Sequence, residues 1–470
     1  MVHHKIKIVF LLGLTLGWCA CIRFHPHELS PRQTLNDFDG RSLNCRELRE
    51  FFKANGQTPD WPLTSWNLHA LTLAGFFFHP DLDVARAQWA VAQAGRLTAG
   101  ERPNPNLSLP TEYNSTLRSG AKAWNPAINF DITIETAGKR GYRIAQARQL
   151  SGSAYLNIHS VAWQVRSRLR QAFLELYAAE HRQTLLSQNQ HLLSETIGIM
   201  ENQLAAGAIS AYELAQARMN FETSRLEWLD AQNTRAQARI SLASALGVPL
   251  SALEGVTFDF AEFEGANVNM PERLARERAL LNRSDLLAAL ADYAASQAAL
   301  QLEVAKQYPD IHLGPGYIRD TLENKWTLGL SFLLPIFNQN HGPIAEAEAR
   351  REEMASRFLA LQTTVLNAIE QAVAGLGQAN DKRQVAAEIE NNLQTQARRA
   401  QSMFKLGEIS KSDLLAIELE HNTAEIALLN ARINTQKALG ALEDAMQDSP
   451  ALTRWMNDVT KEIKENKKRK

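Results

Sequence analysis

The sequence predicts a mainly α-helical protein with a small β part, built as two tandem copies of one plan. The first observation is a repeated turn. LAAGAISAYEL (204–214) and FKLGEISKSDL (404–414) place glycine, isoleucine, serine, an acid and leucine at the same spacing, 200 positions apart. The second is the long helix-favouring stretch around each turn, in which apolar residues recur every three to four positions. Self-similarity at a fixed spacing indicates a duplicated architecture.

Length and charge limit the class of protein. With 470 residues, the chain is long enough for two or three ordinary domains or for one repeated body. The formal net charge of −1 and a pI near 6.9 leave no global basic field, so no nucleic-acid partner is expected. With 24 glycines, 16 prolines and few aromatic residues, the composition favours helix over an all-β chain.

Residues 1–21 have the pattern of a secretory signal. Two lysines precede an apolar run about half as long as the roughly 20 residues that a membrane-spanning helix needs. Cys21 follows small residues in an order similar to a bacterial lipoprotein signal, so we expect its lipidation. Trp18 departs from the usual aliphatic residue at its position, and ordinary cleavage nearby is the alternative. Cys45 is the one thiol left in the body of the chain, which excludes a disulfide framework.

Each copy begins with the same helix. The segment that starts at Asp81 aligns without gaps to the segment that starts at Asp285. The two helices, near 81–102 and 285–307, stop before a proline, which removes a backbone donor and disfavours helix at the preceding residue. The expected divisions of the chain are a signal at 1–21, an N-terminal segment at 22–64, a first repeat at 65–249, an equatorial linker at 250–280, a second repeat at 281–447 and a basic tail at 448–470.

A strand hairpin is predicted after each of these helices. Apolar residues from Ile128 to Ile134, and again from Trp326 to Phe332, alternate with polar ones. Partner strands are expected to begin near 107 and 311, with polar loops near 114–125 and 319–325. The polar face of the first hairpin, expected to line a water-filled pore, consists of Asn129, Asp131, Thr133 and Glu135.

Such hairpins fit a strand with lipid on one side and water on the other. Four strands from one chain cannot close a barrel, and open sheet edges are not tolerated in hydrocarbon. Several chains must therefore pool their strands, and three chains would give twelve.

The stretches at 141–206 and 342–406 predict helices of about 65 residues, which are rods of about 100 Å at 1.5 Å per residue. The return helices, near 211–247 and 411–447, are shorter by about the length of the first helix in each copy. We therefore expect two short helices, stacked end to end, to line each long helix. The phenylalanine-rich linker would form a belt where they meet.

The repeated turn has the features of a helix–turn–helix connection. Gly207 suits the left-handed position that ends a helix, and Ser210 suits the N-cap of the next helix. Glu213 completes a capping box, and Ile209 and Leu214 occupy the positions of a hydrophobic staple. The second copy has Gly407, Ile409, Ser410, Asp413 and Leu414 at the same positions.

Together these features resemble the TolC-like outer membrane factor family. The resemblance rests on the duplication, the helix starts HPDL (79–82) and RSDL (283–286), the turn GERPNPNLSL (100–109) and the paired tip loops. It covers about residues 65–447. It implies a homotrimer with a 12-stranded barrel in outer membrane lipid and an α-helical tunnel through the periplasm.

The resemblance also implies partners. The chain would be the exit duct for an inner-membrane transporter and a periplasmic adaptor. GERPNPNLSL and the cysteine at 21 look most like the heavy-metal and multidrug RND-efflux branches. Lipoproteins that are kept from the outer membrane have Asp directly after the lipidated cysteine. This chain has Ile22 at that position, which agrees with outer membrane placement.

By position, the resemblance assigns adaptor-binding tips to Gly207, Ile209, Ser210, Gly407, Ile409 and Ser410. It assigns the periplasmic gate to Glu213, Asp413, Arg218 and Glu418. The last two have opposite charge at equivalent positions, which allows a weak salt bridge. Ala416 stands where the family has a second acid. This departure from the family leaves open whether Asp413 alone lines the pore. It also leaves open whether Glu213 only caps its helix or also guards the pore.

No catalytic, cofactor or metal-ligand motif emerges, and no enzyme activity is expected. The histidines show no tight ligand pair in the sequence; they include His159, His181, His191, His312, His341 and His421. Two alternatives stay open. One is the outer membrane duct of a type I protein secretion system, and the other is a soluble periplasmic coiled-coil adaptor or scaffold.

Overall fold

The computed structural model describes residues 24–57, 60–116, 123–265, 271–320 and 323–447. Cys21 and the basic tail lie outside these ranges. The chain divides into two compact units, 1–42 and 43–470. Within the first, α2 (Pro31–Asp39) begins at a proline, which suits the first turn of a helix, and the guanidinium of Arg41 lies over the ring of Phe38.

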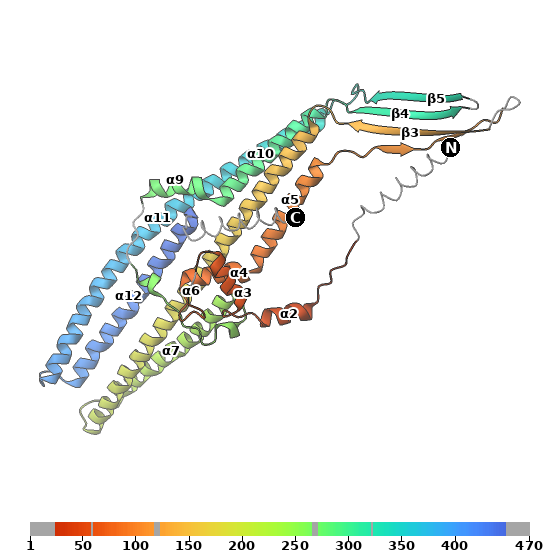
Figure 1. The fold of residues 1–470 in the computed structure, drawn as a ribbon. Helices are drawn as coiled ribbons and strands as arrows, with labels where there is room; N and C mark the ends of the chain where they lie inside the picture. Colours follow the sequence, from red (N-terminus) through yellow and green to blue (C-terminus); the bar gives the residue numbers. More distant parts are fainter. Residues whose placement is uncertain (1–23, 58–59, 117–122, 266–270, 321–322, 448–470) are drawn as a thin grey trace. The chain divides into compact units, whose positions relative to one another are not determined.

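Two long helices, one per copy, dominate the second unit. They are α6 (Lys139–Ala205) and α11 (His341–Lys405), of 67 and 65 residues. Each is followed by a tight turn and by a return helix that packs along it, α7 (Ala211–Leu246) or α12 (Lys411–Met446). Figure 1 shows the strands at one end of α6 and α11 and the two tight turns at the other. The predicted long helices are confirmed, and their ends differ from the expected ones by one or two residues.

Short helices complete the layer on each long helix. α5 (Pro80–Gly100) begins where α7 ends, and both pack on α6. A Cβ added to Gly247, just after α7, would lie 3.0 Å from the Phe78 carbonyl oxygen. In the second copy α10 (Ser284–Ala305) begins where α12 ends, and Arg283 Nη1 donates to the Ala445 carbonyl at 2.7 Å. The end-to-end stacking expected from helix lengths is confirmed.

The two copies pack against each other through α6. Both α10 and α12 of the second copy contact this helix of the first. Gly440 on α12 permits the close approach, because a Cβ there would collide with the guanidinium of Arg170 on α6. That guanidinium donates to the Gln436 carbonyl at 2.8 Å. The duplication therefore produces one packed body.

The main hydrophobic core surrounds the middle of α6. It includes α4 (Leu68–Phe78), where Leu71 and Ala74 are fully buried, and α3 (Arg46–Ala54) packs on α4. The linker adds η1 (Leu250–Leu253) and α8 (Ala261–Glu264) to this core, whereas α9 (Glu272–Asn282) packs on α11 and α12 in a second hydrophobic cluster. Phe263 is 2% exposed, with its ring centre 5.5 Å from that of Phe173 on α6. The expected aromatic contribution of the linker is thus present, whereas the sequence analysis missed α2, α3 and α4.

The strands form one antiparallel sheet in the order β1-β3-β4-β5. They are β1 (Asn106–Ser108), β2 (Thr111–Tyr113), β3 (Trp124–Ile134), β4 (Ile311–Asp320) and β5 (Glu323–Phe332). The register pairs Ile132 with Leu313 and Leu313 with Leu330, so the two hairpins join through β3 and β4.

Two details of the predicted hairpins are wrong. The first arm is broken into β1 and β2, both paired with β3, around Pro110, which has no backbone N–H to donate to a ladder. The second loop is shorter than the expected 319–325, because strand pairing continues to Asp320 and Glu323. Within the described part of the chain, no helix is both long and apolar enough to span a membrane.

Candidate functional site: the tip turns and the two-faced sheet

Both tip turns end their long helix in the same way. Gly207 has φ of +70° and Gly407 has φ of +76°. In the first turn the Ala208 N–H donates to the Gln203 carbonyl at 2.8 Å and the Gly207 N–H donates to the Leu204 carbonyl at 2.9 Å. The second turn repeats this pair of bonds, which define a Schellman motif. A Cβ on either glycine would meet nothing within 4 Å, so backbone conformation rather than space selects glycine.

A capping box starts the next helix in both copies. The Glu213 carboxylate accepts from the Ser210 backbone N–H at 2.7 Å, and Ser210 Oγ accepts from the Glu213 N–H at 3.2 Å. In the second copy Asp413 accepts from the Ser410 N–H at 3.1 Å and donates its own N–H to Ser410 Oγ at 3.2 Å. The capping geometry predicted from the sequence is confirmed.

The capping bonds also favour the ionised form of the two acids. Hydrogen bonds from the Ser210 backbone and hydroxyl lower the pKa of Glu213. Hydrogen bonds from the Ser410 hydroxyl and backbone lower the pKa of Asp413 in the same way. Both acids are therefore anions at neutral pH, while their carboxylates turn back onto their own helix starts.

Arg218 and Glu418, the other two residues assigned to the gate, each form a hydrogen bond within their own pair of helices, α6–α7 or α11–α12. Arg218 Nη2 contacts Glu201 Oε1 at 2.7 Å, and Glu418 Oε1 accepts from Gln401 Nε2 at 3.0 Å. Within the described residues, no salt bridge joins Arg218 to Glu418, which the sequence analysis had allowed between them. Glu201 and Gln401 occupy equivalent positions in the two copies. The same contact is therefore present in both, as Arg218 with Glu201 in the first copy and as Glu418 with Gln401 in the second.

A further contact near the tips joins the two copies. Lys411 Nζ lies 2.9 Å from Glu195 Oε2 on α6, and this hydrogen bond lowers the pKa of Glu195. The pair is partly exposed, so it contributes little stability by itself, of the order of 1 kcal/mol or less. It places Lys411, at the start of α12, beside α6 of the first copy.

The polar strand face gathers the four predicted residues on one side of the sheet. His312 on β4 lies among them, with Nδ1 at 3.1 Å from Asp131 Oδ1 and 3.3 Å from Thr133 Oγ1. A Cβ at Gly316 would collide with the Asn129 side chain, so these two residues also lie against each other. The sequence analysis named His312 but did not assign it to this face, because its partners Asp131 and Thr133 lie on another strand.

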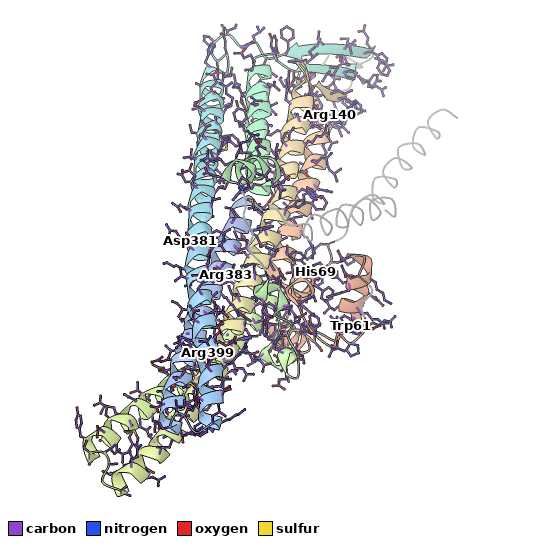
Figure 2. The ribbon with its side chains drawn as sticks, turned by 90° about the vertical axis from the view of Figure 1, so that its left-hand side faces the viewer. Trp61, His69, Arg140, Asp381, Arg383 and Arg399 are labelled. Atoms are coloured by element: carbon purple, nitrogen blue, oxygen red, sulfur yellow. The ribbon has the colours of Figure 1, made fainter. Side chains whose placement is uncertain are left out.

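Glu135 lies where the strands meet the helices. Its carboxylate forms an ion pair with Arg143 on α6, and the second contact measures 3.1 Å. One turn earlier Arg140, labelled in Figure 2, donates to the Gly100 carbonyl at 2.7 Å. Lys139 completes the junction with an ion pair of 2.7 Å to Asp310. Glu135 therefore anchors the sheet to α6 in addition to lying at the end of the polar face.

The opposite face of the sheet is apolar and exposed. On β5, Trp326, Leu328, Leu330 and Phe332 are between 53% and 82% exposed, and on β3 the apolar residues from Ile128 to Ile134 are between 36% and 48% exposed. Aromatic pairs cross neighbouring strands in both hairpins. The ring centres are 4.9 Å apart for Tyr113 and Trp124 and 5.0 Å apart for Tyr317 and Trp326. An apolar band with interfacial aromatic residues is typical of a lipid-facing strand surface.

His421, like His312, shows no tight ligand pair in the sequence but lies close to carboxylates in the structure. His421 and Glu425 on α12 approach Glu390 on α11, so that the possible ligand atoms of all three lie within 4.8 Å of one another. The i, i+4 spacing of His421 and Glu425 is a sequence signal, but the third residue comes from another helix and could not be found by spacing.

Comparisons with known proteins agree with this arrangement. The family model for outer membrane efflux proteins matches residues 78–248 and 275–446, once in each copy. The cobalt-zinc-cadmium resistance protein CzcC of Cupriavidus metallidurans is 27% identical over 287 residues, covering 60% of this chain and 65% of CzcC. The match thus spans slightly less than two thirds of CzcC. The pyoverdine export outer membrane protein OpmQ of Pseudomonas aeruginosa is 27% identical over 349 residues, covering 68% of this chain and 70% of OpmQ.

The fold has a counterpart among crystal structures. The crystal structure of CusC matches this chain with a TM-score of 0.66 at 19% sequence identity. The match covers 83% of this chain and 94% of the CusC chain. The family match covers most of both copies, and the fold is shared with a protein of the same TolC-like architecture. The chain therefore belongs to the outer membrane efflux protein family, whose members are outer membrane channels for export and not enzymes.

Proposed function

We propose that this chain is the outer membrane component of a tripartite efflux system and works as a homotrimer. Three chains would pool their strands into a 12-stranded barrel, and their helices would surround a passive duct through the periplasm. An inner-membrane transporter, of the RND type, and a periplasmic adaptor would deliver the substrate and supply the energy.

The observation that carries this proposal is the two-faced sheet with free edges. One face is apolar and exposed, and the other carries polar and ionisable groups. Within the described residues, β5 pairs only with β4, and β1 and β2 pair only with β3. A membrane-embedded sheet cannot leave such edges unpaired, because each unsatisfied backbone group in hydrocarbon costs several kcal/mol. Copies of the same chain can satisfy both edges.

The tip turns lie at the far end of the long helices from the sheet. Gly207, Ile209 and Ser210, with their equivalents Gly407, Ile409 and Ser410, would dock into the adaptor. Glu213 and Asp413, with Arg218 and Glu418, would form the periplasmic gate. In a trimer each acid would appear three times around the axis, and a ring of anions attracts cations. Cys21 would carry a lipid anchor in the same membrane.

The names of the relatives bear on the substrate. CzcC is named for cobalt, zinc and cadmium resistance, and OpmQ for pyoverdine export. We propose export of metal ions or of small organic molecules such as drugs. The soluble scaffold alternative is set aside, because members of this family are outer membrane proteins.

The proposal is tested on protein purified in detergent from the outer membrane fraction. We expect a band of three chains on unheated gels that becomes a one-chain band after boiling, and steady conductance in planar bilayers. A one-chain species without conductance would overturn the duct. Growth of a deletion strain in zinc or drugs, with and without the restored chain, tests the cargo. Restored secretion of a protein with no change in tolerance would favour a type I secretion duct.

A further inference from the structure

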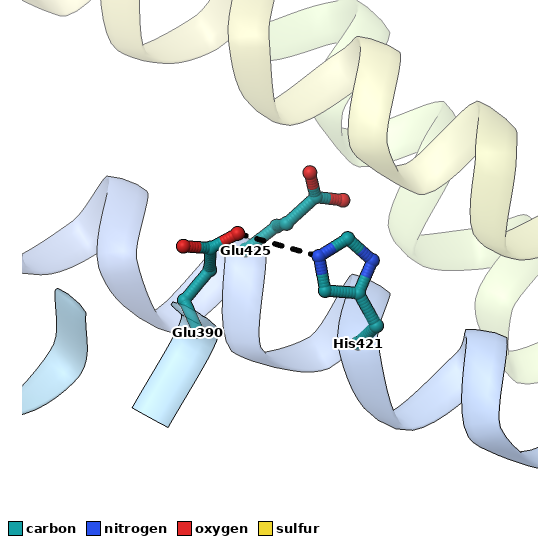
Figure 3. A group of neighbouring side chains, drawn as sticks. All are labelled: Glu390, His421 and Glu425. Carbon is teal, nitrogen blue, oxygen red and sulfur yellow. Dashed lines mark hydrogen bonds and ion pairs between the residues drawn. The ribbon is translucent and has the colours of Figure 1, made fainter. Parts of the chain in front are cut away.

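Three potential metal ligands lie close together between α11 and α12, the helical hairpin of the second copy. Glu390 lies on α11, and His421 and Glu425 lie on α12 (Figure 3). His421 Nε2 is 3.3 Å from Glu390 Oε1, and the possible ligand atoms of all three residues lie within 4.8 Å of one another.

The helices hold these side chains in place. His421 and Glu425 are four residues apart and so share one face of α12. α11 and α12 pack along each other, which brings Glu390 to that face. The side chains of His421 and Glu390 are only 19% and 17% exposed, so most of their motion is restricted by neighbouring groups. Two well-packed helices position ligands more accurately than a loop does.

The donor set and its spacing fit a divalent transition metal. Imidazole nitrogen and carboxylate oxygen are both ligands of Zn²⁺, which bonds to such atoms at about 2.0–2.2 Å. Two ligand atoms that bond to one tetrahedral Zn²⁺ at such lengths are about 3.3 Å apart. His421 Nε2 and Glu390 Oε1 already lie at this separation. A rotation of the flexible Glu425 side chain closes the remaining gap.

Charge also favours a cation at this point. Two partly buried carboxylates near one imidazole carry an excess of negative charge, and no lysine or arginine contact of Glu390 or Glu425 occurs within the described part of the chain. Like charges that lie close together and partly out of water destabilise each other. A divalent ion would remove that repulsion.

The first hairpin provides a natural comparison. The residues 200 positions earlier are Gln190, Phe221 and Arg225. None of these is an acid or a histidine, and Arg225 is cationic. The two copies have therefore diverged at this position, and only the second one brings together a ligand set.

We propose that Glu390, His421 and Glu425 form a site for a Zn²⁺-like divalent cation that links α11 to α12 above the second tip turn, with water as a fourth ligand. The site does not depend on the proposed function. It makes the second hairpin, and not the first, sensitive to the metal concentration around the protein.

The test uses the full chain without a histidine tag, purified in detergent and treated with a chelator. Equilibrium dialysis against Zn²⁺, with metal analysis, should find one tightly bound ion per chain. Co²⁺ in the same site should give the intense visible absorption of tetrahedral coordination. His421→Ala and Glu425→Gln should each weaken Zn²⁺ binding by about tenfold or more and abolish the Co²⁺ signal, because each removes a direct ligand.

His191→Ala is the matched control. His191 Nε2 lies 3.1 Å from Glu195 Oε1 at the same i, i+4 spacing, but the two side chains are 75% and 37% exposed and Glu195 also contacts Lys411. This variant should bind Zn²⁺ as the wild type does. Circular dichroism of the metal-free proteins should show equal helix content, so that lost binding is not lost folding. Wild-type affinity in both ligand variants, or no bound ion in the wild type, would overturn the site.

Discussion

At the scale of single residues, the tip glycines are selected by conformation. Both lie in the left-handed region, and the space around them is open. Any other residue would therefore strain the backbone without striking a neighbour, by about 1–2 kcal/mol for an L-residue with a Cβ. Asparagine tolerates this region better than most residues do.

Because backbone strain and added bulk can be varied independently at the tip glycines, the docking role of the tips can be tested. Gly207→Ala and Gly207→Trp carry similar backbone strain, but only the second adds bulk to the surface. We expect both variants to melt slightly below the wild type as purified oligomers, with Gly207→Asn closer to it. Export should persist in the Ala variant and fail in the Trp variant, and likewise for Gly407. Equal export by the Trp and Ala variants at both positions would contradict adaptor docking at the tips.

The capping acids make the stability of the tips depend on pH. Because their hydrogen bonds lower the pKa of Glu213 and Asp413 in the folded state, the stabilisation is complete above the pKa of the same groups in the unfolded chain. It is lost as the pH falls through the lowered, folded-state pKa. Glu213→Gln keeps an acceptor for the capping box and removes the titration.

We therefore expect the melting temperature of the wild type to fall more steeply on acidification, from neutral pH to below the usual carboxyl range, than that of the double variant Glu213→Gln and Asp413→Asn. Thermal melting followed by circular dichroism over a pH series measures this. Parallel curves for the two proteins would show that the acids do not act through their charge.

At the scale of helices, the contact between the copies depends on a small residue. Gly440→Ala would push a methyl group into the Arg170 guanidinium, which is 8% exposed and held by Gln436. Overpacking of this kind destabilises by about 1–3 kcal/mol. We expect a lower melting temperature and looser packing of α12 on α6.

Gly377→Ala in α11 is the control for this variant. It is also a glycine inside a long helix, but a Cβ there would meet nothing within 4 Å. Alanine in a helix is favoured over glycine by about 0.5–1 kcal/mol, so this variant should melt at a higher temperature than the wild type. Shifts of the same sign for both variants would contradict the close approach at Gly440.

The sequence predicts the repeated elements well, because their signals are local and appear twice. The ends of the long helices follow from the glycine and serine of the tip turns, and the hairpins follow from alternation. The break between β1 and β2 depends on how Pro110 lies against β3. The alternation of apolar and polar residues along the sequence does not reveal this. α4 is apolar on nearly all sides, so it gives no periodic signal of a buried face.

The predicted sites divide in the same way. The capping boxes of Ser210 and Ser410 are local in sequence and are confirmed. The partners of Arg218 and Glu418 lie 17 residues away on the preceding helix, and their pairing depends on how the hairpin closes. His312 and His421 find their carboxylates only after the strands or helices have packed. Their contacts could not be read from spacing along the chain.

At the scale of the whole molecule, the two faces of β5 should differ in their tolerance of charge. Leu330 is 65% exposed on the apolar face, whereas Ser331 is its neighbour on the polar face. Arginine on the lipid side of a barrel costs about 2–4 kcal/mol at the middle of the bilayer. Leu330→Arg should therefore reduce the amount of assembled protein in the outer membrane, and Ser331→Arg should not.

Gel analysis of unheated outer membrane fractions measures both variants of this pair. The Ser331→Arg variant should also show altered conductance in bilayers, because its side chain would enter the duct. Normal assembly of Leu330→Arg, or a larger defect in Ser331→Arg, would reverse the assignment of the two faces.

The unequal edges of the sheet have a consequence for the proposed ring. One edge is the continuous ten-residue β5, and the other is the pair of three-residue pieces β1 and β2. Since β1, β3, β4 and β5 alternate in direction, β5 of one chain and β1 of the next would also run antiparallel. The contact is therefore heterologous, a head-to-tail joint that closes only when the rotation per subunit completes a circle. Because the broken edge offers fewer ladder bonds than a continuous strand does, the subunit joints should be weaker than the β3–β4 and β4–β5 ladders, and the barrel should come apart at the joints before either of these ladders opens.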